Sequence, residues 1–521
     1  MTKLVTSILA SSPSAAATVA RDVQARGGRW IEIRLDGWSA TDDDFDALAA
    51  ALPPGSWIAT CRSVDEGGHA EADTMTRVSR LIAAGLAGAG FVDFEFADWQ
   101  RSANIRQKIQ LAVTRNRTPG TPPAGLILSA HDFSDRPDNP AALPAEIARQ
   151  ESAACVKLAW RARDITDNLL ALDLLRASPV PAIVLCMGPA GLLSRVLAGK
   201  FSAFATYCAP QADAATAPGQ PELDAMLRHY RFDKIGGDTK LFGVIGDPVA
   251  HSMSPVLFNA CFDAHDQDAV YLPLLVAGDA DTFNRFMAGL AERPWLDAAG
   301  FSVTVPHKQH AAAFLGDHVD PLAAQIGAVN TLVRRADGYF GHNTDHAGAL
   351  DAITDALGCD RSDLADLPVE VLGAGGAARA IVAGLRHCGA HVTLFNRNAT
   401  RARELAQAFS CRSKPWEDRG GDHDVRLVIN CTPLGMWPNV DETPLPAERL
   451  EGQPVVFDTV YNPMETRLLR EARLAGCVTV DGVSMFIHQA AAQYRLWFDE
   501  GLDKAFLRSV LTRQLSRQDR A

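Results

Sequence analysis

Short apolar runs recur along the first 207 residues and alternate with Ala-, Leu- and Arg-rich stretches. Near-continuous apolar runs are typical of parallel strands that are buried on both faces, and the stretches between them are typical of helices. Eight such units in about 210 residues predict an α/β fold that begins with a (β/α)8 barrel, with an open doubly wound sheet as the alternative. The expected strands are residues 4–9, 30–35, 57–62, 91–96, 126–131, 155–160, 182–187 and 203–207.

Polar residues of this half lie near the C-terminal ends of the expected strands, which is where (β/α)8 barrels have their active sites. Taken singly, most of them are better explained as surface ion pairs or strand-end carboxylates than as catalytic groups. Lys157 is different because its strand, residues 154–160, is apolar and contains no other charge. A desolvated lysine loses basicity, which makes its amine available as a nucleophile. Together with His131 on the fifth strand and Glu95 on the fourth, it would suit imine chemistry.

Seven segments in this half follow one another in a characteristic order. They are EIRLD at 32–36, ATCRS at 59–63, VDFE at 92–95, SAHDF at 129–133, the strand-six Lys157, MG through SR at 187–195, and APGQ at 217–220. By these segments, residues 1–225 resemble type I 3-dehydroquinate dehydratase.

The resemblance implies a role for each of these residues. Lys157 would form an imine with the substrate's C3 ketone, His131 would move protons, and Glu95 would hold and polarise His131. Arg195 would grip the substrate carboxylate through a two-pronged contact. The pocket would be completed by Glu32, Arg34, Arg62, Thr216 and Gln220. Thr216 stands where the family usually has serine, and we expect this change to have a modest effect.

A glycine-rich turn at residues 373–377 marks a nucleotide site in the second half of the chain. It joins an apolar strand to an apolar helix, which lets the backbone approach a pyrophosphate at the helix N-terminus. The next strand, residues 391–395, ends in Asn396 and Arg397, and Arg401 follows. Arginines at this point accommodate a 2′-phosphate, so the pattern favours NADP over NAD. A solvated basic loop is the alternative.

A second set of motifs fills residues 241–345. Lys308 follows an expected strand and Asp345 follows a Gly-His-Asn-Thr segment. A Lys–Asp pair can pass a proton to an alkoxide while a nicotinamide delivers hydride, although a plain salt bridge has the same composition. Ser252 and Ser254 could bind a carboxylate or cap the next helix.

These motifs resemble shikimate dehydrogenase across residues 241–515. The resemblance implies that Lys308 and Asp345 are the catalytic pair. The implied substrate-binding residues are Ser252, Ser254, Thr304, Asn330, Asn343, Tyr461 and Gln489. The implied cofactor-binding residues are Gly373, Ala374, Gly375, Gly376, Ala377, Asn396, Arg397, Arg401, Thr432, Met436 and Gly482. Asn398 departs from the threonine that usually follows Asn-Arg.

The two resemblances together predict a bifunctional enzyme. The barrel would convert 3-dehydroquinate to 3-dehydroshikimate, and the second half would reduce this ketone to shikimate with NADPH and without a metal. The expected domains are a barrel at 1–225, a substrate-binding domain at 238–345, a Rossmann-like NADP domain at 346–485, and C-terminal helices at 486–521 that return to the substrate domain.

Three alternatives remain beside this prediction. The second half could be a quinate dehydrogenase, although Ser254 leaves little room for the extra hydroxyl of quinate. The barrel could be an inactive scaffold, or the whole chain a metabolite-binding regulator. Complete sets of catalytic residue types argue against both, and a regulator would also need a DNA-binding module, which the sequence does not suggest.

Charge and cysteine usage limit the expected partners and location. A net charge of −12 disfavours nucleic acid and anionic membranes as partners. The sequence has no apolar run of about 18 residues that would predict a membrane span. Ten cysteines without metal-ligand spacing indicate reduced, buried thiols. We therefore expect a cytoplasmic enzyme that acts on small molecules, with no prediction of its oligomeric state.

Overall fold

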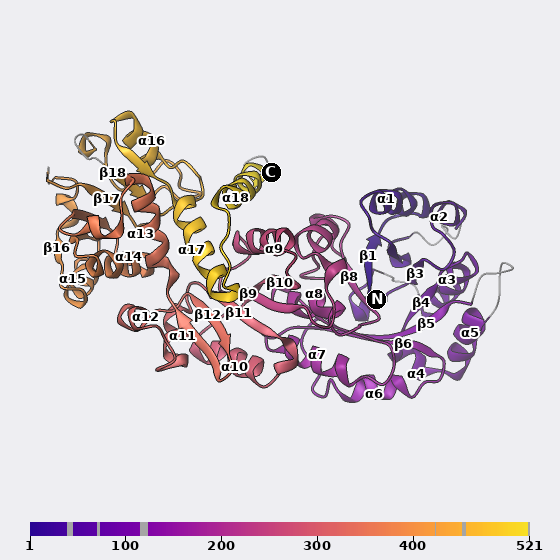
Figure 1. The fold of residues 1–521 in the computed structure, drawn as a ribbon. Coiled ribbons are helices and arrows are strands. Elements are labelled where there is room, and N and C mark those ends of the chain that lie inside the picture. Colours follow the sequence, from indigo (N-terminus) through magenta and orange to yellow (C-terminus); the bar gives the residue numbers. More distant parts are fainter. Residues whose placement is uncertain (39–44, 70–72, 115–122, 422–423, 451–454, 519–521) are drawn as a thin grey trace. The chain divides into compact units, whose positions relative to one another are not determined.

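The computed structural model describes residues 1–38, 45–69, 73–114, 123–421, 424–450 and 455–518 (Figure 1). The chain divides into two compact units. The first contains Met1–Leu241, Pro248–Ala250 and Asp266–Asp297, and the second contains Phe242–Asp247, His251–His265 and Ala298–Ala521.

Within the described residues, eight parallel strands of the first unit form one sheet in the order β7-β6-β5-β4-β3-β2-β1-β8. The amide of Phe204, just before β8, donates to the carbonyl of Ala182 at the start of β7 (2.8 Å), which brings the two ends of the sheet together. The predicted (β/α)8 barrel is therefore confirmed. Its strands are β1 (Lys3–Leu9), β2 (Trp30–Arg34), β3 (Trp57–Thr60), β4 (Phe91–Glu95), β5 (Gly125–Asp132), β6 (Ala153–Arg161), β7 (Ala182–Met187) and β8 (Ala205–Cys208).

Helices separate the barrel strands in the chain, and local capping explains where some of them begin. Pro13 opens α1, and the hydroxyl of Ser12 accepts a hydrogen bond from the amide of Ala15. Asp73 caps α3 in the same way. The helices are α1 (Pro13–Ala25), α2 (Asp46–Ala51), α3 (Thr74–Leu86), α4 (Phe96–Arg101), α5 (Ala103–Thr114), α6 (Ala142–Ala148), α7 (Asp167–Ala177) and α8 (Leu192–Val196).

The first unit also takes in a later segment, Asp266–Asp297, with β10 (Ala269–Leu275) and α10 (Ala280–Ala291). Arg293 binds the carboxylate of Asp173 on α7, with the shortest contact at 2.6 Å. Lys200 donates to Asp297 at 2.7 Å. Polar contacts therefore tie this segment to the barrel helices.

In the second unit, β9 (Lys240–Gly246), β11 (Ala298–Val303), β12 (Thr331–Arg335) and β13 (Gly338–His342) are successive neighbours in one sheet. The pairs β11–β12 and β12–β13 are antiparallel. The helices that accompany these strands in the chain are α9 (Ser254–Ala264), α11 (Lys308–Leu315), α12 (Pro321–Ile326) and α13 (Thr344–Leu357).

Six parallel strands form the other sheet of the second unit, in the order β16-β15-β14-β17-β18-β19. This is the doubly wound order in which a nucleotide binds where the strand order reverses, between β14 and β17. The strands are β14 (Pro368–Leu372), β15 (His391–Phe395), β16 (Arg412–Lys414), β17 (Leu427–Asn430), β18 (Val455–Asp458) and β19 (Val478–Val480). The helices are α14 (Gly376–His387), α15 (Ala399–Ala408), α16 (Arg467–Leu474), α17 (Gly482–Phe498) and α18 (Lys504–Gln518).

The predicted Rossmann-like domain is confirmed by this sheet. Its strands β14, β17 and β18 are almost wholly apolar and buried, as expected for the part of a sheet that is covered on both faces. Within the described part of the chain, no helix has the length and hydropathy needed to cross a membrane.

Candidate active sites

A cavity inside the barrel brings most of the predicted residues of the first half together. Its lining includes Glu32, Arg34, Arg62, His131, Lys157, Arg195, Thr216 and Gln220, as predicted. It also includes Glu66 and Tyr207, which are not among the predicted residues. Glu95 is buried nearby, but it does not belong to this lining.

Lys157 projects from β6 into a charged environment. Its ammonium lies 2.8 Å from Oδ2 of Asp93 and 3.7 Å from Oε1 of Glu32. Residues 154–160 contain no other charge, but these carboxylates come from β4 and β2 and cannot be foreseen from the sequence of β6. Burial alone would raise the pKa of Asp93, but the charges of Arg62 and Lys157 hold it well below its usual range.

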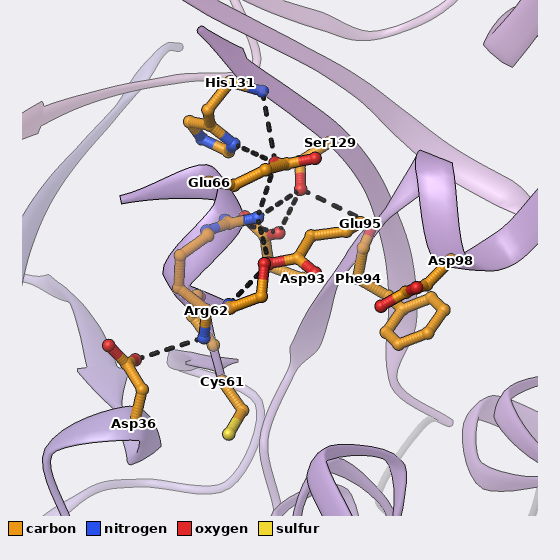
Figure 2. Close-up of polar contacts among 12 residues, drawn as sticks. Asp36, Cys61, Arg62, Glu66, Asp93, Phe94, Glu95, Asp98, Ser129 and His131 are labelled. Carbon is orange, nitrogen blue, oxygen red and sulfur yellow. Dashed lines mark hydrogen bonds and ion pairs between the residues drawn. The ribbon is translucent and has the colours of Figure 1, made fainter. Parts of the chain in front are cut away.

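The predicted contact between Glu95 and His131 is replaced by a different one (Figure 2). Nδ1 of His131 lies 2.9 Å from Oε2 of Glu66, and the His131 amide donates to the same oxygen at 3.1 Å. Glu95 instead accepts from the Ser63 amide at 2.7 Å and pairs with Arg77 at 2.6 Å. The carboxylate that orients His131 is thus Glu66.

Glu66 was missed because it lies outside a strand. It ends a short 3-10 turn, Val64–Glu66, which follows β3 and precedes Gly67, a residue with a left-handed backbone (φ 76°). In the sequence, a Glu-Gly-Gly run resembles a solvated loop. The available signal was its position four residues after Arg62, whose guanidinium lies 3.5 Å from the Glu66 carboxylate.

The buried charges set the protonation of the His131–Glu66 pair. Burial raises the pKa of Glu66 to about 8, against the opposing charge of Arg62. Burial, followed by the charges of Arg62 and Lys157, lowers the pKa of His131 well below its usual value. The imidazole is therefore neutral at neutral pH and can accept a proton.

Arg195 is a buried cation on α8. Its side chain is among the largest fully buried ones, and its Nε has no hydrogen-bond partner among the described residues. Burial lowers the pKa of Arg195 to about 10. Since a buried charge without a counter-ion is unfavourable, the cavity is suited to an anionic ligand group at this position.

The other cavity residues are held by hydrogen bonds within the protein. Arg62 donates to Asp93 and to the hydroxyl of Ser129, both at 2.8 Å. The hydroxyl of Thr216 donates to that of Ser7 at 2.9 Å, and the Thr216 amide donates to Oε1 of Gln220 at 2.8 Å. Arg34 makes a two-pronged contact with Asp36, at 2.9 and 2.7 Å.

A second polar centre lies in the second unit. Nζ of Lys308, the first residue of α11, is 2.5 Å from Oδ2 of Asp345 near the start of α13. Nδ2 of Asn330 donates to Oδ1 of Asp345 at 2.8 Å, and Oδ1 of Asn343 accepts from the Asp345 amide at 3.1 Å. The carboxylate is buried, whereas the lysine side chain is 22% exposed and can meet a ligand.

The remaining predicted substrate residues are less closely tied to this pair. Ser252 and Ser254 flank Met253 at the start of α9, and the Ser252 hydroxyl accepts a hydrogen bond from the amide of Ser254, the first residue of the helix, at 3.3 Å. The capping alternative is therefore realised in part by Ser252. The ring of Tyr461 packs against Phe486. For Ser252, Ser254, Thr304, Tyr461 and Gln489, no hydrogen bond to Lys308 or Asp345 is found among the described residues.

The glycine-rich turn joins β14 to α14 at the point where the strand order reverses. Gly373 has a φ of 117°, and a Cβ there would lie 2.9 Å from the carbonyl oxygen of Cys431. Gly375 immediately precedes α14, and the space around Gly375 and Gly376 is open. The close approach of the backbone at Gly373 to that of Cys431, and the open N-terminus of α14, are both compatible with a bound pyrophosphate.

The loop after β15 fits the 2′-phosphate of NADP. Arg397 and Arg401 are exposed, and Nδ2 of Asn396 donates to the carbonyl of Asn398 at 2.9 Å. Asn398 caps α15 by accepting from the amides of Thr400 and Arg401. The departure from threonine at this position thus retains a helix-capping side chain.

The last predicted cofactor residues lie after β17 and at the start of α17. The amide and hydroxyl of Thr432 both donate to Oδ1 of Asn430, at 2.9 and 2.7 Å. Met436 is 46% exposed, so its thioether is free to contact a ligand. A Cβ at Gly482 would lie 2.4 Å from the carbonyl oxygen of Val460, so only glycine lets α17 begin this close to the loop.

The fold and the two sites define a two-part enzyme, with a lysine-containing barrel lyase followed by a nicotinamide-dependent oxidoreductase. Residues 4–236 match the family described as type I 3-dehydroquinase, and residues 244–332 match the shikimate dehydrogenase substrate binding domain. The chain is 38% identical over 488 residues to the chloroplastic bifunctional 3-dehydroquinate dehydratase/shikimate dehydrogenase of Arabidopsis thaliana, covering 90% of this chain and 78% of the relative. The chain belongs to this bifunctional family.

Further similarities concern the second half alone. An NADP(+) shikimate dehydrogenase of Moorella thermoacetica is 40% identical over 289 residues, which cover 53% of this chain and 94% of the relative. A crystal structure of a shikimate dehydrogenase in complex with NADP+ shares 32% identity and a TM-score of 0.50, over 54% of this chain and 97% of that one.

Proposed function

We propose that the chain catalyses two consecutive reactions, the dehydration of 3-dehydroquinate to 3-dehydroshikimate and the NADPH-dependent reduction of this product to shikimate. The observation that carries the proposal is the buried Lys157 in one cavity with a neutral His131, together with the Lys308–Asp345 pair of the other unit. The product of the first reaction is the substrate of the second.

In the barrel, the amine of Lys157 attacks the substrate ketone and forms an imine, which acidifies the neighbouring C–H. Neutral His131 takes this proton and returns it to the departing hydroxyl, while Glu66 holds its Nδ1 side. Arg195 binds the substrate carboxylate. Asp93 holds the lysine head group in place at 2.8 Å.

In the second unit, NADPH supplies hydride to the ketone carbon when it is bound. Lys308 donates a proton to the developing alkoxide, and the buried Asp345 holds the ammonium at 2.5 Å. Asn330 fixes the other oxygen of Asp345, so the carboxylate keeps its orientation. Ser252 and Ser254 would receive the substrate carboxylate.

A coupled assay tests the proposal as a whole. Purified protein supplied with 3-dehydroquinate and NADPH is expected to oxidise the cofactor and accumulate shikimate. No cofactor oxidation with 3-dehydroquinate, but oxidation with added 3-dehydroshikimate, would contradict the barrel assignment. The purified protein is also assayed with NADP+ and either shikimate or quinate. Faster turnover of quinate would favour the alternative that the second half is a quinate dehydrogenase.

The Glu66 carboxylate, rather than that of Glu95, is expected to control the basicity of His131. We expect Glu66→Gln to lower the kcat of dehydration about ten-fold or more above pH 8, where Glu66 is ionised, because the imidazole then loses its charged partner. Glu95→Gln is the matched control, since Glu95 pairs with Arg77 and should affect thermal stability more than kcat. Steady-state kinetics and thermal unfolding of both variants check this; an equal loss of kcat would contradict it.

Arg195→Met should separate ligand binding from stability. The variant removes a buried cation that has no partner for its Nε, so thermal stability should be maintained or increased. The KM for 3-dehydroquinate should rise about 100-fold because the substrate carboxylate loses its charged partner. Kinetics and calorimetry provide the measurement. An unchanged KM would show that the carboxylate binds elsewhere.

Arg397→Ala should distinguish the two nicotinamide cofactors. The exposed guanidinium is expected to pair with the 2′-phosphate, which NADPH carries and NADH lacks. We expect the KM for NADPH to rise about ten-fold and that for NADH to stay within about two-fold. Steady-state kinetics with each cofactor test this, and equal effects on both would rule out the 2′-phosphate contact.

We also propose a reducing compartment such as the cytoplasm. All ten cysteines are free thiols, and six of them are buried. Protein thiols persist in this form where glutathione and thioredoxin keep them reduced. The proposed division of the second half into residues 238–345, 346–485 and 486–521 can be tested by limited proteolysis.

A further inference from the structure

The hydroxyl of Tyr207 is a buried polar group that the proposed mechanism does not use. Tyr207 lies on β8, is 4% exposed, and packs with apolar residues of the barrel interior. Its hydroxyl has no hydrogen-bond partner among the residues that the structure describes. A buried hydroxyl without a partner is unfavourable, so its presence here needs a reason.

The ring of Tyr207 lies directly beside the proposed nucleophile. Nζ of Lys157 is 4.3 Å from the ring centroid, while the same ammonium contacts Asp93 and approaches Glu32. Burial, followed by the charges of Glu32 and Asp93, holds the pKa of Tyr207 well above its usual value. The group therefore remains a protonated O–H donor within electrostatic reach of two carboxylates.

Imine formation reduces the number of N–H donors that Lys157 presents to these carboxylates. An ammonium and a ketone give an iminium and one water: a C=N bond replaces the C=O bond, and the ketone oxygen leaves with two of the three ammonium protons. The positive charge is retained, but a single N–H donor remains. Asp93 and Glu32 thereby lose donors in a site that excludes bulk water, where unpaired carboxylate oxygens are unfavourable.

We propose that Tyr207 is a positioning residue of the dehydratase site, whose hydroxyl donates to Asp93 or Glu32 once Lys157 has become an imine. The unpaired hydroxyl of the free protein is the donor held ready for that state. Glu32 already accepts from the hydroxyls of Ser7 and Thr60, whereas Asp93 holds Lys157 through Oδ2 and Arg62 through Oδ1. Oδ2 of Asp93 is therefore the oxygen that loses most when the ammonium is consumed. This inference rests on the proposed imine chemistry.

Tyr207→Phe tests the role because it keeps the ring against Lys157 and removes only the hydroxyl. In the full-length chain, we expect the kcat of dehydration to fall about ten-fold, with the KM for 3-dehydroquinate changing less than about two-fold. Rapid quenching with borohydride should show a slower rise and a lower plateau of mass added at Lys157. Thermal stability should be unchanged or higher, since an unpaired polar group has been removed.

Two controls accompany this variant. Tyr230→Phe removes a hydroxyl from the same unit outside the cavity lining and should change neither kcat nor the trapped mass. Reduction of 3-dehydroshikimate by the same molecules should be unaffected. Wild-type kcat and trapping in Tyr207→Phe would overturn the inference, as would a loss of kcat that is matched by a loss of thermal stability. A wild-type protein that traps no mass at Lys157 would instead overturn the proposed function.

Discussion

Lys157→Ala is expected to abolish dehydration while the reduction of 3-dehydroshikimate continues at the wild-type rate. The alanine leaves no amine to form the imine, and the buried carboxylates of Asp93 and Glu32 lose their shared cation. We expect the kcat of dehydration to fall about 10⁴-fold or more, because the covalent route is removed rather than impaired. The two activities are measured separately, each with its own substrate.

Lys108→Ala is a suitable control, since Lys108 lies on α5 and outside the cavity lining. It should leave both activities unchanged. Borohydride treatment of the wild-type protein with 3-dehydroquinate should add the mass of the reduced adduct to the peptide that contains Lys157. A substrate-derived mass on another lysine, or persistent dehydration by Lys157→Ala, would refute the assignment.

Lys308→Ala should have the second largest effect, this time on the reductase alone. The variant removes the proton donor to the alkoxide, so kcat should fall about 10³-fold, while the KM for NADPH stays within about three-fold. Stopped-flow or steady-state absorbance of the cofactor measures both. Dehydration by the same molecules is the internal reference for correct folding of the barrel.

Lys504→Ala provides the matched control, because Lys504 also pairs with an aspartate, Asp355, at 2.8 Å in the same unit. That pair is exposed, so its loss should be nearly neutral for both activity and stability. A comparable decrease of kcat in both variants would show that the Lys308–Asp345 contact is a structural salt bridge. A large rise in the KM for NADPH would place Lys308 in cofactor binding instead.

Much of the fold could be predicted because it depends on patterns along the chain. Apolar runs at regular intervals indicated the barrel strands, and the glycine-rich turn indicated the nucleotide sheet. The order and direction of the strands also placed Lys157 and His131 at the same cavity. These features follow from strand order and strand direction alone.

Contacts between strands and loops could not be predicted in the same way. Asp93 lies 2.8 Å from Lys157 although the two are far apart in sequence. The sequence of strand β6 does not predict this contact. Glu66 reaches His131 from a turn after β3, a position that a strand-end argument passes over in favour of Glu95. Register and loop conformation decide such contacts, and a single sequence does not specify either.

The barrel unit is assembled from pieces that are separated along the chain. The segment Asp266–Asp297 belongs to this unit, because its Arg293 pairs with Asp173 on α7 and its Asp297 accepts from Lys200. The unit therefore extends past the point where the first family match ends, at residue 236. Splitting the gene near that residue would leave Asp173 without Arg293 and Lys200 without Asp297. Each separated polypeptide would then expose charged side chains that are paired in the intact chain. Dividing this enzyme into two independent proteins would therefore require substitutions at these positions.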